Sequence, residues 1–236
     1  MNYRSLLTAS LIITGLWLLR CLVAGESLLV YAFIIWNVFL AAIPVLLEPL
    51  FGYVQLRLSG WLKRFAQLLL AGSWLLFLPN AFYVITDFMH LNPDVLVNRR
   101  RDGQLHLTDY GRGDAMYVLD SVLLFAATLF GAYVGGLALL HGYRFLRRRL
   151  SVSWSRAALA GIMLLVAVGV YIGRYGRWNS WDGLLRPWQV AFDLLQSLTH
   201  HVALQRFAIM VLAMMIFQLL CLWGIWRLTD GKADQR

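Results

Sequence analysis

Six long apolar runs constrain this chain more than any other feature of its sequence. They cover residues 5–24, 27–47, 64–86, 115–141, 157–175 and 203–226. A helix needs about 20 apolar residues to cross the hydrocarbon core of a bilayer. Because lipid offers no partner to backbone N–H and C=O groups, such runs must satisfy them internally, as helices do. The sequence therefore predicts an all-α, polytopic transmembrane helix bundle of about six spans.

Composition supports a membrane protein and argues against nucleic acid as a partner. The chain is 60% hydrophobic and 14% charged, whereas soluble domains average about 25% charged residues. The net charge is +9, but the basic residues stand at the ends of apolar runs, where they set topology and contact anionic headgroups. No repeat or linker divides the chain, so we expect residues 1–236 to form a single transmembrane domain in the lipid bilayer. The oligomeric state stays open.

Two GxxxG patterns predict close helix packing. They are Gly131–Gly135 and Gly169–Gly173. Small residues at this spacing let two helix backbones approach each other in lipid. We therefore interpret both as packing motifs without a functional role.

The distribution of Lys and Arg predicts the orientation in the membrane. Twelve of the 21 lie on the side of the N-terminus and nine on the other. The concentrated run from Arg144 to Arg149 in a short loop favours the first side as the cytoplasm. Arg20 and Cys21 interrupt a signal-peptide cleavage pattern, so we expect the first run to be retained. The prediction is N-in and C-in.

Two connections between runs have a pattern of their own. Residues 92–113 contain Asp102-Gly103, a favoured hairpin turn, between alternating apolar residues. A small extracytoplasmic hairpin and a plain loop are both open there. Residues 187–201 begin with a proline and show apolar residues at helical spacing, which indicates an amphipathic interfacial helix. The alternative is that they are the start of the last span.

Polar residues gather where the third, fourth and fifth runs end or begin. Pro79 cannot donate to the helix ladder and leaves the Leu75 carbonyl free, so we expect a kink there, with Asn80 able to satisfy the freed groups. Run three exits, run four enters and run five exits on one side of the membrane, so their polar residues share one end of the bundle. Trp36 and Asn37 lie deeper, in the second run. The candidate polar cluster comprises Asn80, Tyr83, Asp87, His90, Asp120, Arg174, Arg177, Trp178, Asn179 and Asp182.

Three stretches also carry a resemblance. They are WNVFLAAIP (36–44), LPNAFYVITDFMHL (78–91) and GVYIGRYGRWNSWD (169–182). They resemble the signature stretches of a bacterial integral membrane protein family known as domain of unknown function 1361. That family usually has a second proline where Phe82 stands. The resemblance implies a multi-pass protein of the bacterial cytoplasmic (inner) membrane and no established activity.

Three interpretations of the polar cluster are open. In the first it is structural or binds a ligand, with Arg174 and Arg177 pairing with carboxylates or holding an anionic lipid or phosphate-bearing ligand. In the second it is an extracytoplasmic-face enzyme acting on a lipid-linked or phosphate-bearing substrate, to which Asp87 and His90 could add a metal. In the third the chain is a small-solute transporter, because Pro79-Asn80 resembles the broken helices that place backbone groups near a transport site. Whether it is an enzyme, and which cofactor or metal it uses, stay unknown from sequence.

Overall fold

The predicted all-α class is confirmed. The structure, a computed structural model, describes residues 3–24, 28–90 and 110–230. The predicted hairpin between Val95 and Leu107 lies outside them. The described elements are α1 (Tyr3–Ala24), α2 (Leu28–Arg57), α3 (Gly60–Tyr83), η1 (Val84–His90), α4 (Tyr110–Arg147), α5 (Val152–Tyr171), η3 (Ile172–Gly176), α6 (Ser180–Leu185), α7 (Pro187–Ser197) and α8 (His201–Asp230).

Among the described residues, six helices are long and apolar enough to cross a membrane, as the sequence predicts. Their apolar spans are Ser5–Val23, Phe33–Arg57, Gly60–Phe88, Tyr117–Arg147, Val152–Gly176 and His201–Thr229. The second run extends about ten residues past its predicted end at residue 47, because α2 continues through Pro44 and Pro49. Neighbouring helices and side chains re-satisfy the backbone groups that a proline frees in a membrane helix, so a proline there need not end it.

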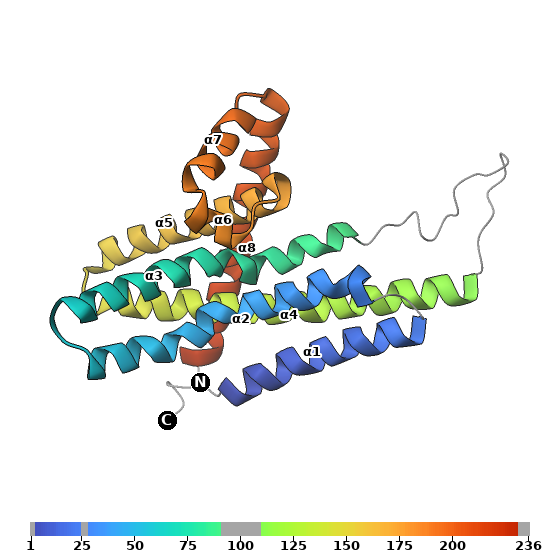
Figure 1. The fold of residues 1–236 in the computed structure, drawn as a ribbon, viewed down its shortest axis with the longest axis horizontal. Helices are drawn as coiled ribbons and strands as arrows, with labels where there is room; N and C mark the ends of the chain where they lie inside the picture. Colours follow the sequence, from blue (N-terminus) through green and yellow to red (C-terminus); the bar gives the residue numbers. More distant parts are fainter. Residues whose placement is uncertain (1–2, 25–27, 91–109, 231–236) are drawn as a thin grey trace.

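Five of the six long helices run alongside one another, and the sixth crosses them (Figure 1). Helix α4 is central, because it packs against α1, α2, α3, α5 and α8. The stretch from Val134 to Leu140 is buried without a break. Helix α8 packs on α4 and α5 but passes steeply across them (Figure 1). The bundle of side-by-side helices therefore consists of α1 to α5.

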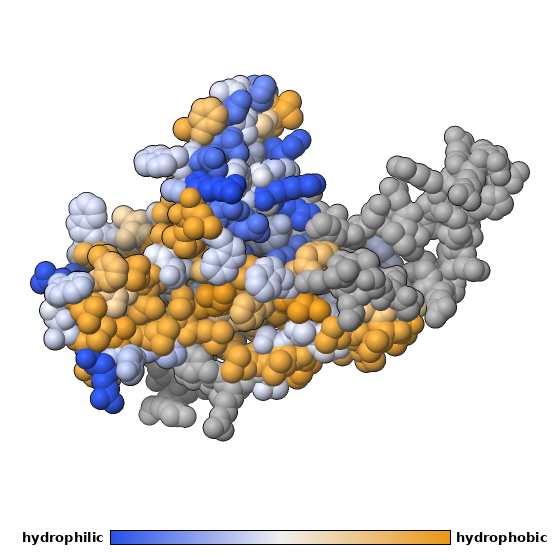
Figure 2. All heavy atoms as spheres, in the orientation of Figure 1, coloured by the Kyte–Doolittle hydropathy of each residue, from blue (hydrophilic) through white to orange (hydrophobic). Residues whose placement is uncertain are grey.

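Helices α6 and α7 are separate from the last span. A short turn separates Ser197, the last residue of α7, from His201, the first of α8. Pro187 stands at the start of α7, where its missing N–H costs no helix bond. We call α6 and α7 the lobe; with the first turns of α8 it projects from the bundle (Figure 1). Apolar side chains cover the bundle, whereas hydrophilic ones gather where the lobe meets it (Figure 2).

The first GxxxG motif brings α4 against α3. A Cβ on Gly131 would meet the backbone carbonyl oxygen of Ala81, and a Cβ on Gly135 would lie 2.6 Å from the Phe82 ring. Phe82 is fully buried and packs edge-on against Phe217. A proline at this position, as in the family pattern, could not supply that ring. The predicted packing role of this motif is confirmed.

The second GxxxG motif brings α5 against the other side of α3. A Cβ on Gly169 would lie 2.7 Å from Cγ of Pro79, and one on Gly173 would lie 3.3 Å from the Tyr83 ring. The end of α3 is therefore held between α4 and α5 by glycines on both. This contact fixes the positions of the polar residues that follow Pro79.

Among the described residues, an Arg–Asp ion pair and a His–Glu contact attach α4 to its neighbours at opposite ends. Arg20 of α1 forms a two-point contact with Asp120, with Nε 2.6 Å from Oδ1 and Nη2 2.7 Å from Oδ2. Farther along α4, Nδ1 of His141 lies 2.6 Å from Oε2 of Glu48 on α2. The Arg20 side chain is 4% exposed. Such charges persist inside a membrane protein only where a partner compensates them.

Candidate functional site

The site begins where α3 and α5 lose their regular α-helical form. Helix α3 continues past Pro79 to Tyr83 and then tightens into the 3₁₀ helix η1. Helix α5 widens into the π-helix η3, and single π-turns of this kind frequently mark functional sites. Both transitions occur at the same end of the bundle. They set the directions in which the polar side chains of the candidate cluster project.

Asn80 links α3 to the lobe. Its Nδ2 donates to the Phe77 carbonyl oxygen at 3.0 Å and to Oγ of Ser180 in α6 at 2.9 Å. The carbonyl that Asn80 bonds is that of Phe77, not the Leu75 carbonyl that Pro79 leaves free. The second bond joins the end of α3 to the first residue of α6. Asn80 thereby holds the lobe against the bundle.

Asp87 is the most deeply buried carboxylate of the candidate cluster. Its exposed fraction is 0%. Asn37 of α2 donates from Nδ2 to Oδ2 of Asp87 at 2.9 Å. Nη1 of Arg174 lies 3.9 Å from Oδ1, which accepts no hydrogen bond within the described residues. That distance allows charge attraction but is too long for a hydrogen bond. Arg174 is thus held near Asp87 by charge.

Asp120 lies outside this group of contacts. Its two oxygens accept from Arg20 of α1, and it does not line the pocket described below. The sequence placed Arg20 on the same side of the membrane as Asp120 but outside the cluster. The sequence could have predicted this pair, because an arginine inside an apolar run requires a carboxylate partner at the same depth.

Asp182 and Asn179 have a local role. They form a capping box at the start of α6, in which the Asn179 side chain accepts from the backbone of Asp182. In return the backbone N–H of Asn179 donates to Oδ2 of Asp182 at 2.8 Å. The spacing of an N-cap residue and an acidic residue three positions later is a known start signal for a helix. This role could therefore have been predicted from the sequence.

Arg177 adopts a backbone conformation that only glycine takes at little cost. Its φ is 56° and its ψ 28°, which is left-handed, and it directly follows η3. A non-glycine residue in this region stores strain of order 1–3 kcal/mol, and such residues cluster at functional sites. The Arg177 side chain is exposed, and across the described residues it makes no hydrogen bond or ion pair. Its charge is therefore available to a ligand.

A pocket of about 700 Å³ lies between α2, α3, α5 and the lobe. This size is within the range of small-molecule sites. Its polar end is lined by Asn37, Asn80, Arg174, Arg177, Asn179 and Ser180. The aromatic residues of the lining are Trp36, Tyr83, Trp178 and Trp181. Its apolar end is lined by Leu40, Leu75, Leu76 and Leu165. Among the described residues no Asp or Glu lines it, so the lining carries positive charge.

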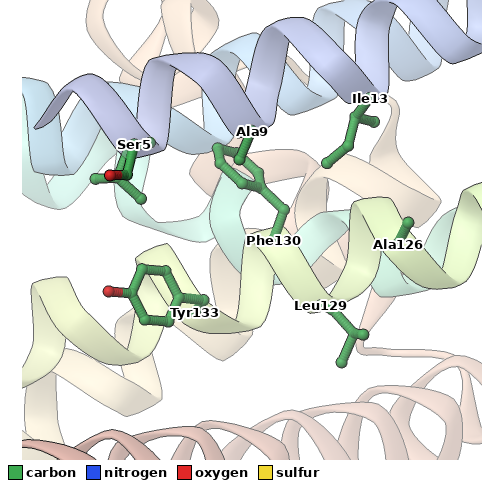
Figure 3. A pocket seen from close by; sticks show the side chains of 8 residues that line it. Ser5, Ala9, Ile13, Ala126, Leu129, Phe130 and Tyr133 are labelled. Carbon is green, nitrogen blue, oxygen red and sulfur yellow. The ribbon is translucent and has the colours of Figure 1, made fainter. Parts of the chain in front are cut away.

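A second pocket of about 490 Å³ differs in character. It lies between α1 and α4 and is lined mainly by apolar side chains such as Ile13 and Phe130 (Figure 3). Ser5 and Tyr133 supply its polar atoms, and no charged residue lines it within the described chain. Nothing in it selects one ligand over the surrounding acyl chains. The first pocket is therefore the candidate functional site.

Six of the ten candidate residues line the pocket, together with residues from outside the cluster. Asn80, Tyr83, Arg174, Arg177, Trp178 and Asn179 line it. Trp36 and Asn37 of α2 also line it, although the sequence placed them deeper in the membrane. The side chain of His90 lies outside the described residues. In the part of the chain that the structure describes, no three His, Cys, Asp or Glu residues are grouped to hold a metal ion.

A comparison with known families identifies the chain. The profile of the family described as "Protein of unknown function (DUF1361)" matches residues 36–221. The chain belongs to this family. The DUF1361 region begins at Trp36, the first pocket residue, and includes every residue of the pocket lining. Arg20, the partner of Asp120, precedes it. Comparisons with curated proteins and with solved structures found no match.

Proposed function

We propose that this protein binds an anionic amphiphile, a phosphate-bearing lipid or lipid-linked molecule, in the pocket between α2, α3, α5 and the lobe. The observation that carries the proposal is the polarity of the lining, which changes from two arginines at one end to leucines at the other. A lipid has the same sequence of parts, a charged headgroup followed by an apolar chain.

Two arginines supply the recognition of the anion. Arg177 is exposed and unpaired within the described chain, and Arg174 also lines the pocket, with Nη1 3.9 Å from Oδ1 of Asp87. A guanidinium group offers a planar fork of donors that matches phosphate oxygens. Asp87 compensates part of the charge of Arg174 from behind, since it does not itself line the pocket. The net charge of the lining therefore favours an anion.

The positions of Asp87 and Asp182, the described carboxylates of the candidate cluster near the pocket, support a binding role rather than a hydrolytic one. A general base must lie within hydrogen-bond reach of the proton it takes, directly or through one water. Asp87 is fully buried, and it does not line the pocket. The capping contact with the Asn179 backbone occupies Oδ2 of Asp182. Neither group is placed to activate water beside an occupant.

The location we propose is the cytoplasmic (inner) membrane of a bacterium, with the N- and C-termini in the cytoplasm. The basic run from Arg144 to Arg149 lies in the short connection between α4 and α5 and supports this orientation. The pocket then lies toward the extracytoplasmic side. The amphipathic helix α7, whose Trp188 and Phe192 are exposed, lies in the interface on that side.

Lipid titration of the purified full-length chain tests the proposal. We expect dioleoylphosphatidylmethanol, a phosphodiester monoanion, to bind more tightly than zwitterionic dioleoylphosphatidylcholine, with Trp fluorescence as the readout. Arg177→Gln should weaken binding of the anionic lipid about tenfold or more, because hydrogen bonds to charged groups contribute about 1.5–3 kcal/mol. Arg156→Gln, an exposed arginine near the other end of α5, is the matched control. Equal binding of both lipids, or no loss in the Arg177 variant, rejects the proposal.

A further inference from the structure

Two asparagines at the polar end of the pocket already donate hydrogen bonds within the protein, Asn80 with both of its N–H groups and Asn37 with one of its two. Nδ2 of Asn37 donates to the carboxylate of Asp87, and Nδ2 of Asn80 donates to the Phe77 carbonyl and to Ser180. A carboxylate and a backbone carbonyl can only accept hydrogen bonds. The orientation of both amides is therefore fixed by chemistry, since a flipped amide would place oxygen against oxygen.

Each amide also keeps a carbonyl oxygen, Oδ1, that can only accept. Within the described residues neither Oδ1 accepts a hydrogen bond, and neither is fully enclosed by protein atoms. An ionised phosphodiester also offers acceptors alone. A headgroup consisting only of phosphate would therefore bind Arg174 and Arg177 and leave the oxygens of Asn37 and Asn80 without a donor.

We propose that the headgroup held in this pocket carries hydroxyl groups beside its phosphate, as a polyol or sugar phosphate does; this rests on the proposed binding of an anionic amphiphile. Hydroxyl hydrogens would donate to Oδ1 of Asn37 and Oδ1 of Asn80 while the arginines hold the phosphate. One ligand then satisfies both the donors and the acceptors at the polar end.

The aromatic lining matches the same chemistry. The indole rings of Trp36, Trp178 and Trp181 line the pocket, and Trp36 and Trp181 are 49% and 47% exposed. An indole presents a flat apolar face with partial negative charge, which packs against the C–H groups of a polyol or sugar ring. The hydroxyls of such a ring project outward from its edge, where amide oxygens can accept from them.

Two kinds of lipid share this chemistry. One is a glycerophospholipid with a polyol headgroup, such as a phosphatidylglycerol or a phosphatidylinositol. The other is an isoprenoid phosphate that carries a sugar. In both, hydroxyl donors stand next to a phosphodiester monoanion and an apolar chain. The test therefore contains both, with a charge-matched lipid that has no hydroxyl groups.

The experiment measures dissociation constants of the full-length chain in a polyoxyethylene detergent, which carries no sugar to compete for the pocket. The probes are dioleoylphosphatidylmethanol, dioleoylphosphatidylglycerol, dioleoylphosphatidylinositol and glucosyl farnesyl phosphate. We expect each hydroxylated lipid of the diacyl set to bind about fivefold or more tightly than phosphatidylmethanol, since one neutral hydrogen bond contributes about that factor. The tighter of phosphatidylinositol and glucosyl farnesyl phosphate identifies the kind of lipid.

A tryptophan pair supplies the variant and its control. Trp36→Leu should weaken phosphatidylinositol binding about threefold or more relative to any change in phosphatidylmethanol binding, because the ring contact with the polyol is lost in the first complex alone. Trp61→Leu, at an exposed position of α3 outside the pocket, should change neither. Equal affinities for phosphatidylmethanol and phosphatidylinositol overturn the hydroxyl inference. If Arg177→Gln still weakens both lipids in that case, the proposed function stands.

Discussion

At the residue scale, the chain places Asp87 where neither water nor lipid can stabilise its charge. Asn37 supplies one hydrogen bond, and Arg174 supplies a positive charge at 3.9 Å. Removing one partner of a buried ion pair leaves the other uncompensated, which costs more than the pair contributes. The stability of this end of the bundle should therefore depend on Asp87 more than on the surface carboxylates.

We predict that Asp87→Asn lowers the free energy of unfolding by about 2 kcal/mol or more. The expected loss is below the typical ~3–5 kcal/mol for a buried pair, because the Arg174 contact is longer than a hydrogen bond. Thermal unfolding in detergent measures it. Asp193→Asn, at an exposed position of α7, is the control and should change stability by less than about 0.5 kcal/mol. Equal unfolding curves for the two variants would contradict this account of Asp87.

The left-handed residue after η3 gives a second prediction at this scale. Arg177→Gly should keep or raise the unfolding temperature, because glycine adopts φ 56° without a steric penalty of about 1–2 kcal/mol. The same variant should bind the anionic lipid more weakly. Arg186→Gly is the comparison: its φ is −138°, so glycine relieves no strain there and adds only flexibility. If the Arg177→Gly variant unfolds at a lower temperature than wild type, the left-handed backbone of Arg177 does not store strain.

At the element scale, the close approach of α5 to α3 depends on one glycine. A Cβ on Gly169 would lie 2.7 Å from the Pro79 ring, whereas one on Gly161 would meet nothing within 4 Å. Both residues belong to α5, so they differ in their surroundings and not in their helix. The pair separates the effect of packing from that of helix propensity.

We predict opposite signs for alanine at these two positions. Gly161→Ala should stabilise the protein by about 0.5–1 kcal/mol, because alanine has less backbone freedom to lose. Gly169→Ala should destabilise it by about 1–3 kcal/mol, the usual cost of overpacking. Thermal unfolding of the two purified variants measures both. Stabilisation by Gly169→Ala would mean that the Pro79 contact is not tight.

Elements with local causes could be predicted from the sequence, and those with non-local causes could not. The six apolar runs and the two glycine motifs are periodic, local patterns. The predicted end of the second run at residue 47 was wrong, because the effect of Pro44 and Pro49 on a helix depends on the neighbouring helices. The π-helix at Ile172–Gly176 has no sequence signal of its own. Asp120 was grouped with Arg174 by membrane side alone, and side does not decide which helices touch.

At the scale of the whole molecule, the orientation in the membrane stays a prediction. A reporter fused after Leu91 should be extracytoplasmic, and one fused after Arg149 should be cytoplasmic. The ground is the basic connection between α4 and α5. Alkaline phosphatase and green fluorescent protein fusions measure the two sides. A reporter after Arg149 that is active outside the cytoplasm would reverse the orientation and place the pocket at the cytoplasmic face.

The Arg20–Asp120 ion pair and the His141–Glu48 contact of α4 have a consequence for the surrounding lipid. Asp120 and His141 are three heptads apart along α4, about 31 Å at about 1.5 Å per residue. The hydrocarbon core of a typical bilayer is about 30 Å thick. Each pair can then sit at one boundary of the core. A thicker bilayer would draw a pair into hydrocarbon or force α4 to stay upright, and a thinner one would tilt it. The distance between the two contacts therefore matches one membrane thickness. The protein should be most stable in a bilayer whose hydrocarbon core is as thick as the distance between Asp120 and His141.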